Sequence, residues 1–209
     1  MPLVRKPAGA PQPAATATPA SVLEGLGSSS EDIRWAAARA AAELPECAPA
    51  LAAALRRESV PRVRTAILTS LARRGDAASA AAILQLLRSD DAGQRAAALD
   101  ALRLMIHGTA DLLPALLEDT DADIRILSCE LARALPGATA TPLLCQLLRR
   151  EPEVNVCAAA VEVLAEVGQR EALPELAQCA ARFPDEPFLS FAIQVAAGRI
   201  STRPPHPRV

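Results

Sequence analysis

The chain has 209 residues, of which 51% are hydrophobic and 22% are charged, and this is enough apolar material to bury one continuous core. The formal net charge is −2 and aromatic residues make up only 2%. These values exclude a globally basic, nucleic-acid-binding chain and argue against aromatic platforms that stack bases or ligands.

The chain begins with a segment that is rich in Pro, Ala and Thr, residues 1–20, and that lacks the apolar run of a signal peptide. We predict a disordered tail there and a second one over residues 201–209, with one domain over residues 21–200 between them. No apolar run reaches membrane-spanning length. Five cysteines without paired spacing indicate free thiols in a reducing, cytoplasmic compartment.

From residue 21 onwards a pattern recurs six times, every 30 to 32 residues. Its marker positions are Arg34, Arg64, Arg95, Arg125, Val156 and Phe188. Apolar residues stand twelve and nine positions before each marker, and four and seven positions after it, which predicts a helix A and a helix B in each unit. In the third unit this pattern places Leu86 and Leu99 in the core. A repeat of this length predicts an all-α solenoid of about six stacked antiparallel helix pairs.

The starts of the B helices resemble those of HEAT repeats, in particular the short HEAT-like repeats of phycobilin lyases and many bacterial proteins. The closest matches are Asp32-Ile33-Arg34-Trp35-Ala36-Ala37-Ala38 and Asp123-Ile124-Arg125. The resemblance covers residues 21–200 and implies a right-handed α-solenoid. It is specific for fold and unspecific for function, because such repeats serve scaffolds, chaperones and enzyme accessories alike.

Residues that could carry out chemistry are few. The histidines, His107 and His206, have no partners at a spacing that would hold a metal or orient a base. We therefore predict no catalytic residue, no metal site and no cofactor. Cys129 and Cys179 fall on the core positions of their helices. Cys157 stands near the start of a helix, where the N-terminus could favour a reactive thiolate, and whether it is reactive stays open.

The most regular polar feature is the arginine at the first four markers, Arg34, Arg64, Arg95 and Arg125. Guanidinium can bond two acceptors at once, so we expect a structural ladder in which these arginines pair with acids or carbonyls of the adjoining unit. The acids in the same turns are Asp32, Asp90, Asp91, Asp121 and Asp123. Replacing Arg95 by alanine should then lower stability. The alternative interpretation is a binding stripe for phosphate or for an acidic partner.

The outer ridge of helix B, on the expected concave side, is formed by residues one and five positions after each marker. The predicted partner-binding residues are Trp35, Arg39, Thr69, Asp100, Glu130, Val161 and Ile193 at these positions, and Arg103 and Arg133 eight positions after their markers. We expect Asp100 and Glu130 to be exposed, so that reversing both charges leaves the fold intact. The apolar end of the ridge, at Val161 and Ile193, is either part of a groove or the core of a terminal cap.

These patterns favour a non-enzymatic protein–protein interaction module of bacterial type, such as an adaptor, a secretion-system accessory or an immunity-like binder. It would grip a protein or peptide on helix B and bind neither nucleic acid nor membrane. One alternative, implied by the resemblance, is an enzyme accessory or a bilin-lyase-like cofactor-attachment factor. Another is a helical-repeat nucleic-acid-binding protein, which would need a basic concave face.

Overall fold

The structure is a computed structural model that describes residues 17–203. This part of the chain forms helices and turns and contains no strand. Most of the two predicted tails lies outside the described residues. At their inner edges, however, the chain is already helical: α1 begins at Pro19 and α13 ends at Thr202. The helical domain therefore extends two residues beyond each of its predicted bounds, because Thr18 caps α1 through its side chain and α13 continues past Ile200.

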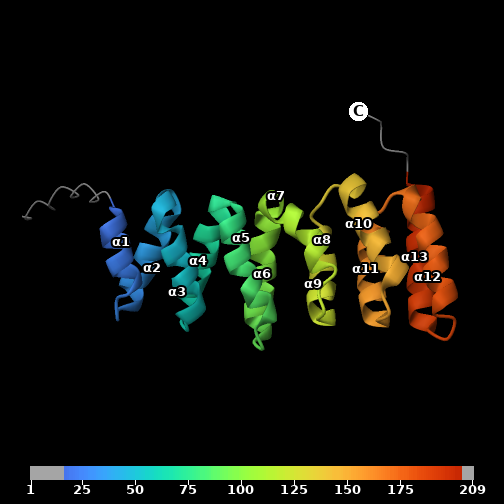
Figure 1. Ribbon diagram of the computed structural model, residues 1–209, viewed down its shortest axis with the longest axis horizontal. Helices are drawn as coiled ribbons and strands as arrows, with labels where there is room; N and C mark the ends of the chain where they lie inside the picture. The colour runs from blue at the N-terminus through green and yellow to red at the C-terminus, as the bar shows by residue number, and fades with distance from the viewer. Residues whose placement is uncertain (1–16, 204–209) are drawn as a thin grey trace, which may run out of the picture.

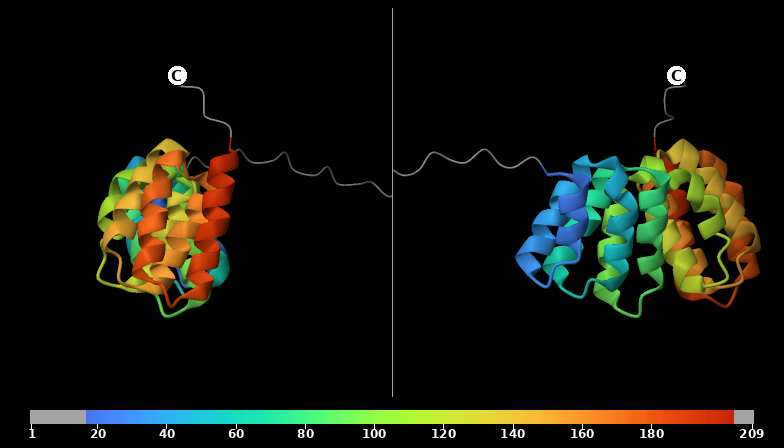
Figure 2. Two further views of the ribbon diagram at one scale, coloured as in Figure 1. Left: turned by 90° about the vertical axis from the view of Figure 1, so that its right-hand side faces the viewer. Right: turned by 60° about the vertical axis from the view of Figure 1, so that its left-hand side comes forward.

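Helix pairs follow one another along the chain and stack side by side into an elongated array, with α1 at one end and α12 and α13 at the other (Figure 1). The first helices of the pairs, helices A, are α1 (Pro19–Leu26), α3 (Ala48–Arg57), α5 (Ala77–Leu84), α8 (Leu113–Leu116), α10 (Gly137–Arg150) and α12 (Leu173–Arg182). The second helices, helices B, are α2 (Glu31–Ala40), α4 (Pro61–Arg74), α6 (Ala92–Leu104), α9 (Ala122–Ala132), α11 (Val154–Val167) and α13 (Pro187–Thr202). Viewed along the array, successive pairs lie behind one another, which is the arrangement of an all-α solenoid (Figure 2).

Short elements complete the chain between these helices. The 3₁₀ turns are η1 (Ala41–Glu43), η2 (Pro45–Cys47), η3 (Gln85–Arg88), η4 (Ala110–Leu112) and η5 (Arg170–Ala172), and α7 (Ile106–Thr109) is a single turn of α-helix. The turn η3 corrects one predicted core residue. A 3₁₀ turn has three residues per turn, so Leu87 is buried there and Leu86 is only partly buried.

Two glycines allow a close contact between successive units. Gly75 ends α4 with a φ of 67°, a left-handed conformation that favours glycine. A Cβ atom on Gly108, in α7, would lie 2.2 Å from the carbonyl oxygen of Gly75. Any side chain at position 108 would therefore force α7 away from the end of α4.

The hydrogen bonds at the helix starts define the register of the six units. The fourth residue of each B helix donates its backbone N–H to the residue that caps the helix. These six residues are Arg34, Arg64, Arg95, Arg125, Cys157 and Ser190. The predicted markers Val156 and Phe188 are therefore early by one and two residues. The fifth and sixth units are longer than the first four, and without an arginine the regular spacing alone cannot reveal the extra residues.

The core runs through the whole array as two adjoining hydrophobic clusters. One extends from Val22 of α1 to Ala140 of α10, and the other from Leu117, just after α8, to Ile200 of α13. Leu99 and Leu102 of α6 both belong to the first cluster, so the predicted burial of Leu99 is confirmed. Each unit thus buries its apolar side against its neighbours, and the remaining sides of the helices are exposed.

Candidate functional site

The four marker arginines lie where helix A turns into helix B, and each donates to a carbonyl oxygen six residues earlier in the chain. The acceptors are Ser28, Glu58, Ser89 and Asp119, at 3.0, 2.7, 2.7 and 2.8 Å from Arg34, Arg64, Arg95 and Arg125 respectively. The guanidinium thus ties the loop between helices A and B to the start of helix B. It does so by giving a charged donor to a loop carbonyl that lies outside the helical hydrogen-bond pattern. The ladder is therefore built mainly within each unit.

Two of these arginines also join neighbouring units. Arg34 makes a two-pronged contact with Glu58 at 2.8 and 3.2 Å, and Arg125 makes the same contact with Glu151 at 2.7 and 2.8 Å. The side chains of Glu58 and Glu151 are only 7% and 2% exposed. The hydrogen bond from Arg34 holds the pKa of the Glu58 carboxyl below its ordinary value. These two glutamates each follow the last residue of a helix A.

Within residues 17–203, none of the predicted aspartates forms a salt bridge with a ladder arginine, which corrects that expectation. Asp91 and Asp121 accept backbone N–H groups at the starts of α6 and α9, where a carboxylate satisfies donors that the helix leaves free. Asp32 pairs with Arg62 of the next unit at 2.7 Å. Asp91 and Asp121 are thus used by the helix starts, and the longer side chains of Glu58 and Glu151 reach Arg34 and Arg125.

In the fifth unit a cysteine takes the place of the ladder arginine. The Cys157 thiol lies 3.6 Å from the Glu151 carbonyl oxygen, which is again six residues earlier. Arg182 of α12 also donates to the carbonyls of Leu148 and Glu151 and so supplies the missing charge. The hydrogen bond with Cys179, together with burial, raises the pKa of Cys157. A buried thiol that is held protonated is a structural side chain and a poor nucleophile.

The other cysteines are also enclosed. All five are buried and free. Burial raises the pKa of Cys129 to about 12 and that of Cys145 to about 11. Among residues 17–203, no group of three or more His, Cys, Asp and Glu side chains is arranged to hold a metal ion. In the same part of the chain, none of the helices has the length and apolar character needed to cross a bilayer.

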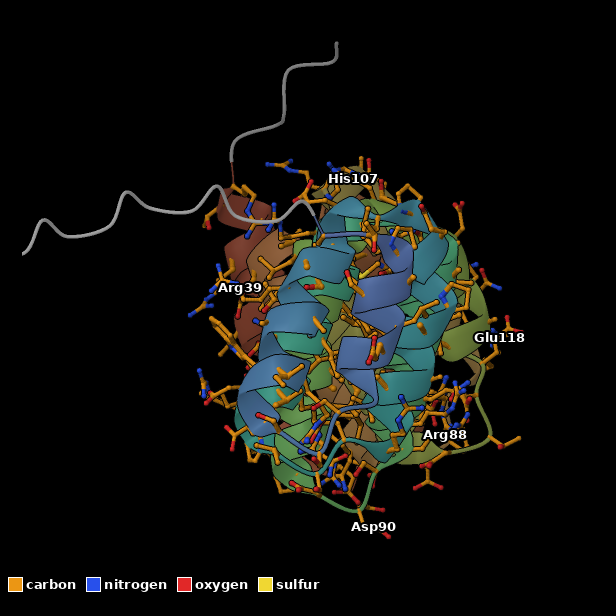
Figure 3. All side chains as sticks on the ribbon, turned by 90° about the vertical axis from the view of Figure 1, so that its left-hand side faces the viewer. Arg39, Arg88, Asp90, His107 and Glu118 are labelled. Carbon is orange, nitrogen blue, oxygen red and sulfur yellow. The ribbon has the colours of Figure 1, made fainter. Side chains whose placement is uncertain are left out.

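One side of the array is made of the outward ridges of the B helices, and we call it the helix B face. It comprises the residues two positions before, one after and five after each structural marker. They are Asp32, Trp35, Arg39, Arg62, Thr65, Thr69, Gly93, Ala96, Asp100, Asp123, Ile126, Glu130, Asn155, Ala158, Glu162, Phe188, Phe191 and Val195. None of these residues is buried. Figure 3 shows Arg39 on this flank, with Arg88 and Glu118 on the opposite flank. His107 and Asp90 lie at the turns on the two remaining edges.

At the N-terminal end this face carries an aromatic ring between two cations. The guanidinium groups of Arg39 and Arg62 lie 4.7 and 4.8 Å from the centre of the Trp35 ring. Arg62 also pairs with Asp32. Thr69, one unit further along, is exposed. Cation–π contacts of this kind hold exposed side chains in place, so the first two units present an ordered polar surface.

The middle of the face is a chain of ion pairs that links α6, α9 and α11. Arg103 lies 3.3 Å from Asp100 and 3.1 Å from Glu130. Arg133 lies 2.9 Å from Glu130 and 3.7 Å from Glu162, and it also contacts Glu166. We call these six residues the acidic network, because its four carboxylates outnumber its two guanidinium groups.

The carboxylates of this network differ in how far they reach into solvent. The side chains of Asp100 and Glu162 are 74% and 69% exposed, whereas Glu130 is partly buried between Arg103 and Arg133. The expectation that Glu130 stands free in solvent is therefore wrong. A lysine at position 130 would face two arginines, so the proposed double reversal with Asp100 would disturb the fold.

The C-terminal end of the face is apolar, but its residues differ from those predicted. Val161 and Ile193 are buried, because the register of their units is shifted and they point into the core. The exposed positions are instead Phe188 (73%), Phe191 (65%) and Val195 (36%) of α13. We call these three residues the apolar stripe. Counted from the structural marker Ser190, they stand two positions before, one after and five after it, as Asp32, Trp35 and Arg39 do around Arg34. The correct register of the sixth unit would therefore have predicted them.

Comparisons with known proteins bear on this architecture. A protein-family model described as HEAT repeats matches residues 19–103 and 109–197. A comparison with curated proteins found no match.

Similar solved structures include an engineered protein, a designed armadillo repeat protein and a phycocyanin lyase complex. An engineered protein is 16% identical, covers 88% of this chain and 96% of its own, and has a TM-score of 0.42. A designed armadillo repeat protein is 15% identical, covers 87% of this chain and 99% of its own, and has a TM-score of 0.43. A chain of the complex of CpcE and CpcF of phycocyanin lyase from Nostoc is 15% identical, covers 95% of this chain and 100% of its own, and has a TM-score of 0.40.

Proposed function

This chain belongs to the HEAT-repeat family, and from that premise we propose that it is a non-catalytic module that holds a protein partner against its helix B face. HEAT repeats provide a scaffold suited to protein binding. Within such a scaffold, function depends on the side chains displayed on a continuous surface, because the units themselves repeat only the core.

The observation that carries this proposal is the acidic network. It links three successive B helices through side-chain ion pairs, while its outermost carboxylates, Asp100 and Glu162, stay largely exposed. Exposed ion pairs contribute little to stability, so stability alone is a weak reason for so many charges on one ridge. Carboxylates held in place by arginines are ordered before a partner arrives, and less side-chain entropy is then lost on binding.

The composition of the face also favours a protein over a nucleic acid. A phosphate backbone needs a row of Lys and Arg, and along this face it would meet the excess of carboxylates at α6, α9 and α11. A protein partner can match the succession of cationic, acidic and apolar surface with its own side chains. Together these features support a proteinaceous partner.

A matched pair of charge reversals tests the proposal. The test variant is Asp100→Lys/Glu162→Lys, which changes two exposed carboxylates on the helix B face. The control variant, Glu46→Lys/Asp111→Lys, makes the same change in net charge at two exposed acids in η2 and η4, away from that face. Circular-dichroism melts should show that both variants keep the wild-type fold, since exposed substitutions rarely change stability much.

The partner is first identified by affinity chromatography on the immobilised wild-type chain and is then purified for titration calorimetry. We expect the control variant to bind it as the wild type does, and the test variant to bind roughly tenfold more weakly or worse. A test variant that binds with wild-type affinity, or a control variant that loses binding, would contradict a partner site on the helix B face.

A further inference from the structure

We propose that the helix B face receives a basic amphipathic helix of the partner protein, with its apolar side on the apolar stripe and its Lys and Arg residues beside Glu162 and Glu166. This inference rests on the proposed function and specifies the chemistry of the partner. It comes from two neighbouring helices, α11 and α13, which pack against each other along the last two units (Figure 1).

The apolar half of this surface is the stripe itself. Phe188, Phe191 and Val195 follow one another at intervals of three and four residues, so they lie on one side of α13. The chain has only three phenylalanines, and two of them stand largely exposed here. Single exposed apolar residues are common on soluble proteins, but a contiguous set on one helix marks a contact surface.

The charged half lies on the adjoining ridge. Glu162 and Glu166 are one turn apart on α11, and both lie near Arg133. Glu130 and Asp100 extend the acidic network away from α13, so negative charge borders the stripe on one side. The exposed Arg199 follows Val195 by one turn, which places a positive charge at one end of the stripe. Glu162 occupies on α11 the position that Val195 occupies on α13, so the cations of a ligand should lie over α11, beside the Val195 end of the stripe.

The spacing of these groups fits a helix better than an extended strand. From Phe188 to Val195 the stripe spans eight residues of α13, or about 10 Å at the helical rise. A bound helix repeats apolar side chains at the same intervals of three, four and seven residues, so it can lie along α13 with successive contacts to all three residues. Lys and Arg on one flank of that helix would then lie over Glu162 and Glu166, where opposite charges attract.

A synthetic peptide of about 18 residues, or five helical turns, is the probe. It carries leucines along one side at intervals of three and four residues, lysines on the adjacent flank, and alanine and glutamine elsewhere. One comparison peptide has the same composition in scrambled order, and another has glutamate in place of each lysine. Fluorescence anisotropy measures the affinity of each labelled peptide for the full chain at low and moderate salt.

Three variants separate the contributions of the surface. Phe188→Ser/Phe191→Ser removes the stripe and Glu162→Gln/Glu166→Gln removes the neighbouring charge. Leu23→Ser, an exposed apolar residue of α1 at the other end of the array, is the control. All of the altered residues are exposed, so melts of the three variants should match the wild type.

We expect the basic amphipathic peptide to bind at micromolar concentration and the two comparison peptides at least roughly tenfold more weakly. The Phe variant should lose roughly tenfold in affinity, the Glu variant should lose less and should show a smaller salt dependence, and the Leu23 control should bind as the wild type does. The inference is overturned if the amphipathic peptide fails to bind, if the scrambled or acidic peptide binds as well, or if the Phe variant keeps full affinity.

The same variants also test a second copy of the chain as the occupant. If wild-type protein self-associates in sedimentation experiments and Phe188→Ser/Phe191→Ser abolishes that association, the stripe is an interface between copies and the inference is wrong. The two proposals can fail separately. A partner that still depends on Asp100 and Glu162 while the peptide does not bind would leave the function standing and refute only the basic helix.

Discussion

Replacing Arg125 by alanine should lower the free energy of unfolding by about 3–5 kcal/mol, because the change removes one partner of a buried ion pair. Glu151 is almost fully enclosed and accepts two hydrogen bonds from Arg125 and one from the backbone N–H of Glu153. Without the guanidinium, the carboxylate keeps only the backbone donor. The carbonyls of Asp119 and Thr120 lose their charged donor as well.

Arg95 provides the matched comparison, because it occupies the same place in the third unit with fewer contacts. It donates to the carbonyl of Ser89, and no carboxylate among residues 17–203 forms a salt bridge with it. A hydrogen bond from a charged donor contributes about 1.5–3 kcal/mol, so Arg95→Ala should cost less than Arg125→Ala. The difference between the two variants comes chiefly from the stranded carboxylate of Glu151, with a smaller part from the carbonyl of Thr120.

Urea denaturation followed by circular dichroism measures the free energy of unfolding of both variants and of the wild type. A double variant, Arg125→Met/Glu151→Leu, should recover much of the loss, because apolar residues of similar volume can replace a buried pair. The reasoning would be refuted if Arg125→Ala cost no more than Arg95→Ala. It would also be refuted if the double variant were less stable than Arg125→Ala.

Three further measurements test the ladder and the core. Because Arg34 lowers the pKa of Glu58, the stability that this pair contributes is present above the ordinary glutamate pKa of about 4.3 and is lost as the pH falls through the lower folded pKa. The stability difference between wild type and Arg34→Ala should therefore shrink in acid, and a difference equal at neutral and low pH would contradict this. Leu102→Ala should cost about 2–5 kcal/mol in the same denaturation assay, and more than Leu99→Ala, since Leu102 is fully buried and Leu99 is 9% exposed. Thiol reagents should modify the cysteines slowly in native protein and rapidly in denaturant, and fast native labelling of Cys157 would show that its burial is wrong.

The solenoid could be predicted from the sequence because its repeat is visible in residue types. In the first four units the arginine at the fourth position of helix B fixes the register, and the apolar positions around it then identify core residues such as Leu99. In the last two units that arginine is absent, and a spacing of 30 to 32 residues alone does not fix the register. The extra residues ahead of α11 and α13 moved the markers to Cys157 and Ser190.

This shift of one or two residues explains the main errors at the candidate site. A helix turns by about 100° per residue, so a small error in register exchanges inward and outward positions. The predicted surface positions Val161 and Ile193 are thus buried, and the predicted marker Phe188 is exposed on the helix B face. The glutamate partners of the ladder could have been found, because Glu58 and Glu151 both follow the last residue of a helix A.

The ladder and the helix B face are physically separable, and this separation links the stability argument to the binding argument. The marker position and the centre of the face differ by about 130° around helix B. Arg125 points to the turn and to Glu151 of the next unit, whereas Glu130, five residues later, points outward to the acidic network. A variant of the ladder should therefore change the melting of the protein without changing its affinity for a basic helix. Variants of the stripe and of the exposed carboxylates Asp100 and Glu162 should do the reverse, because these side chains are largely in solvent.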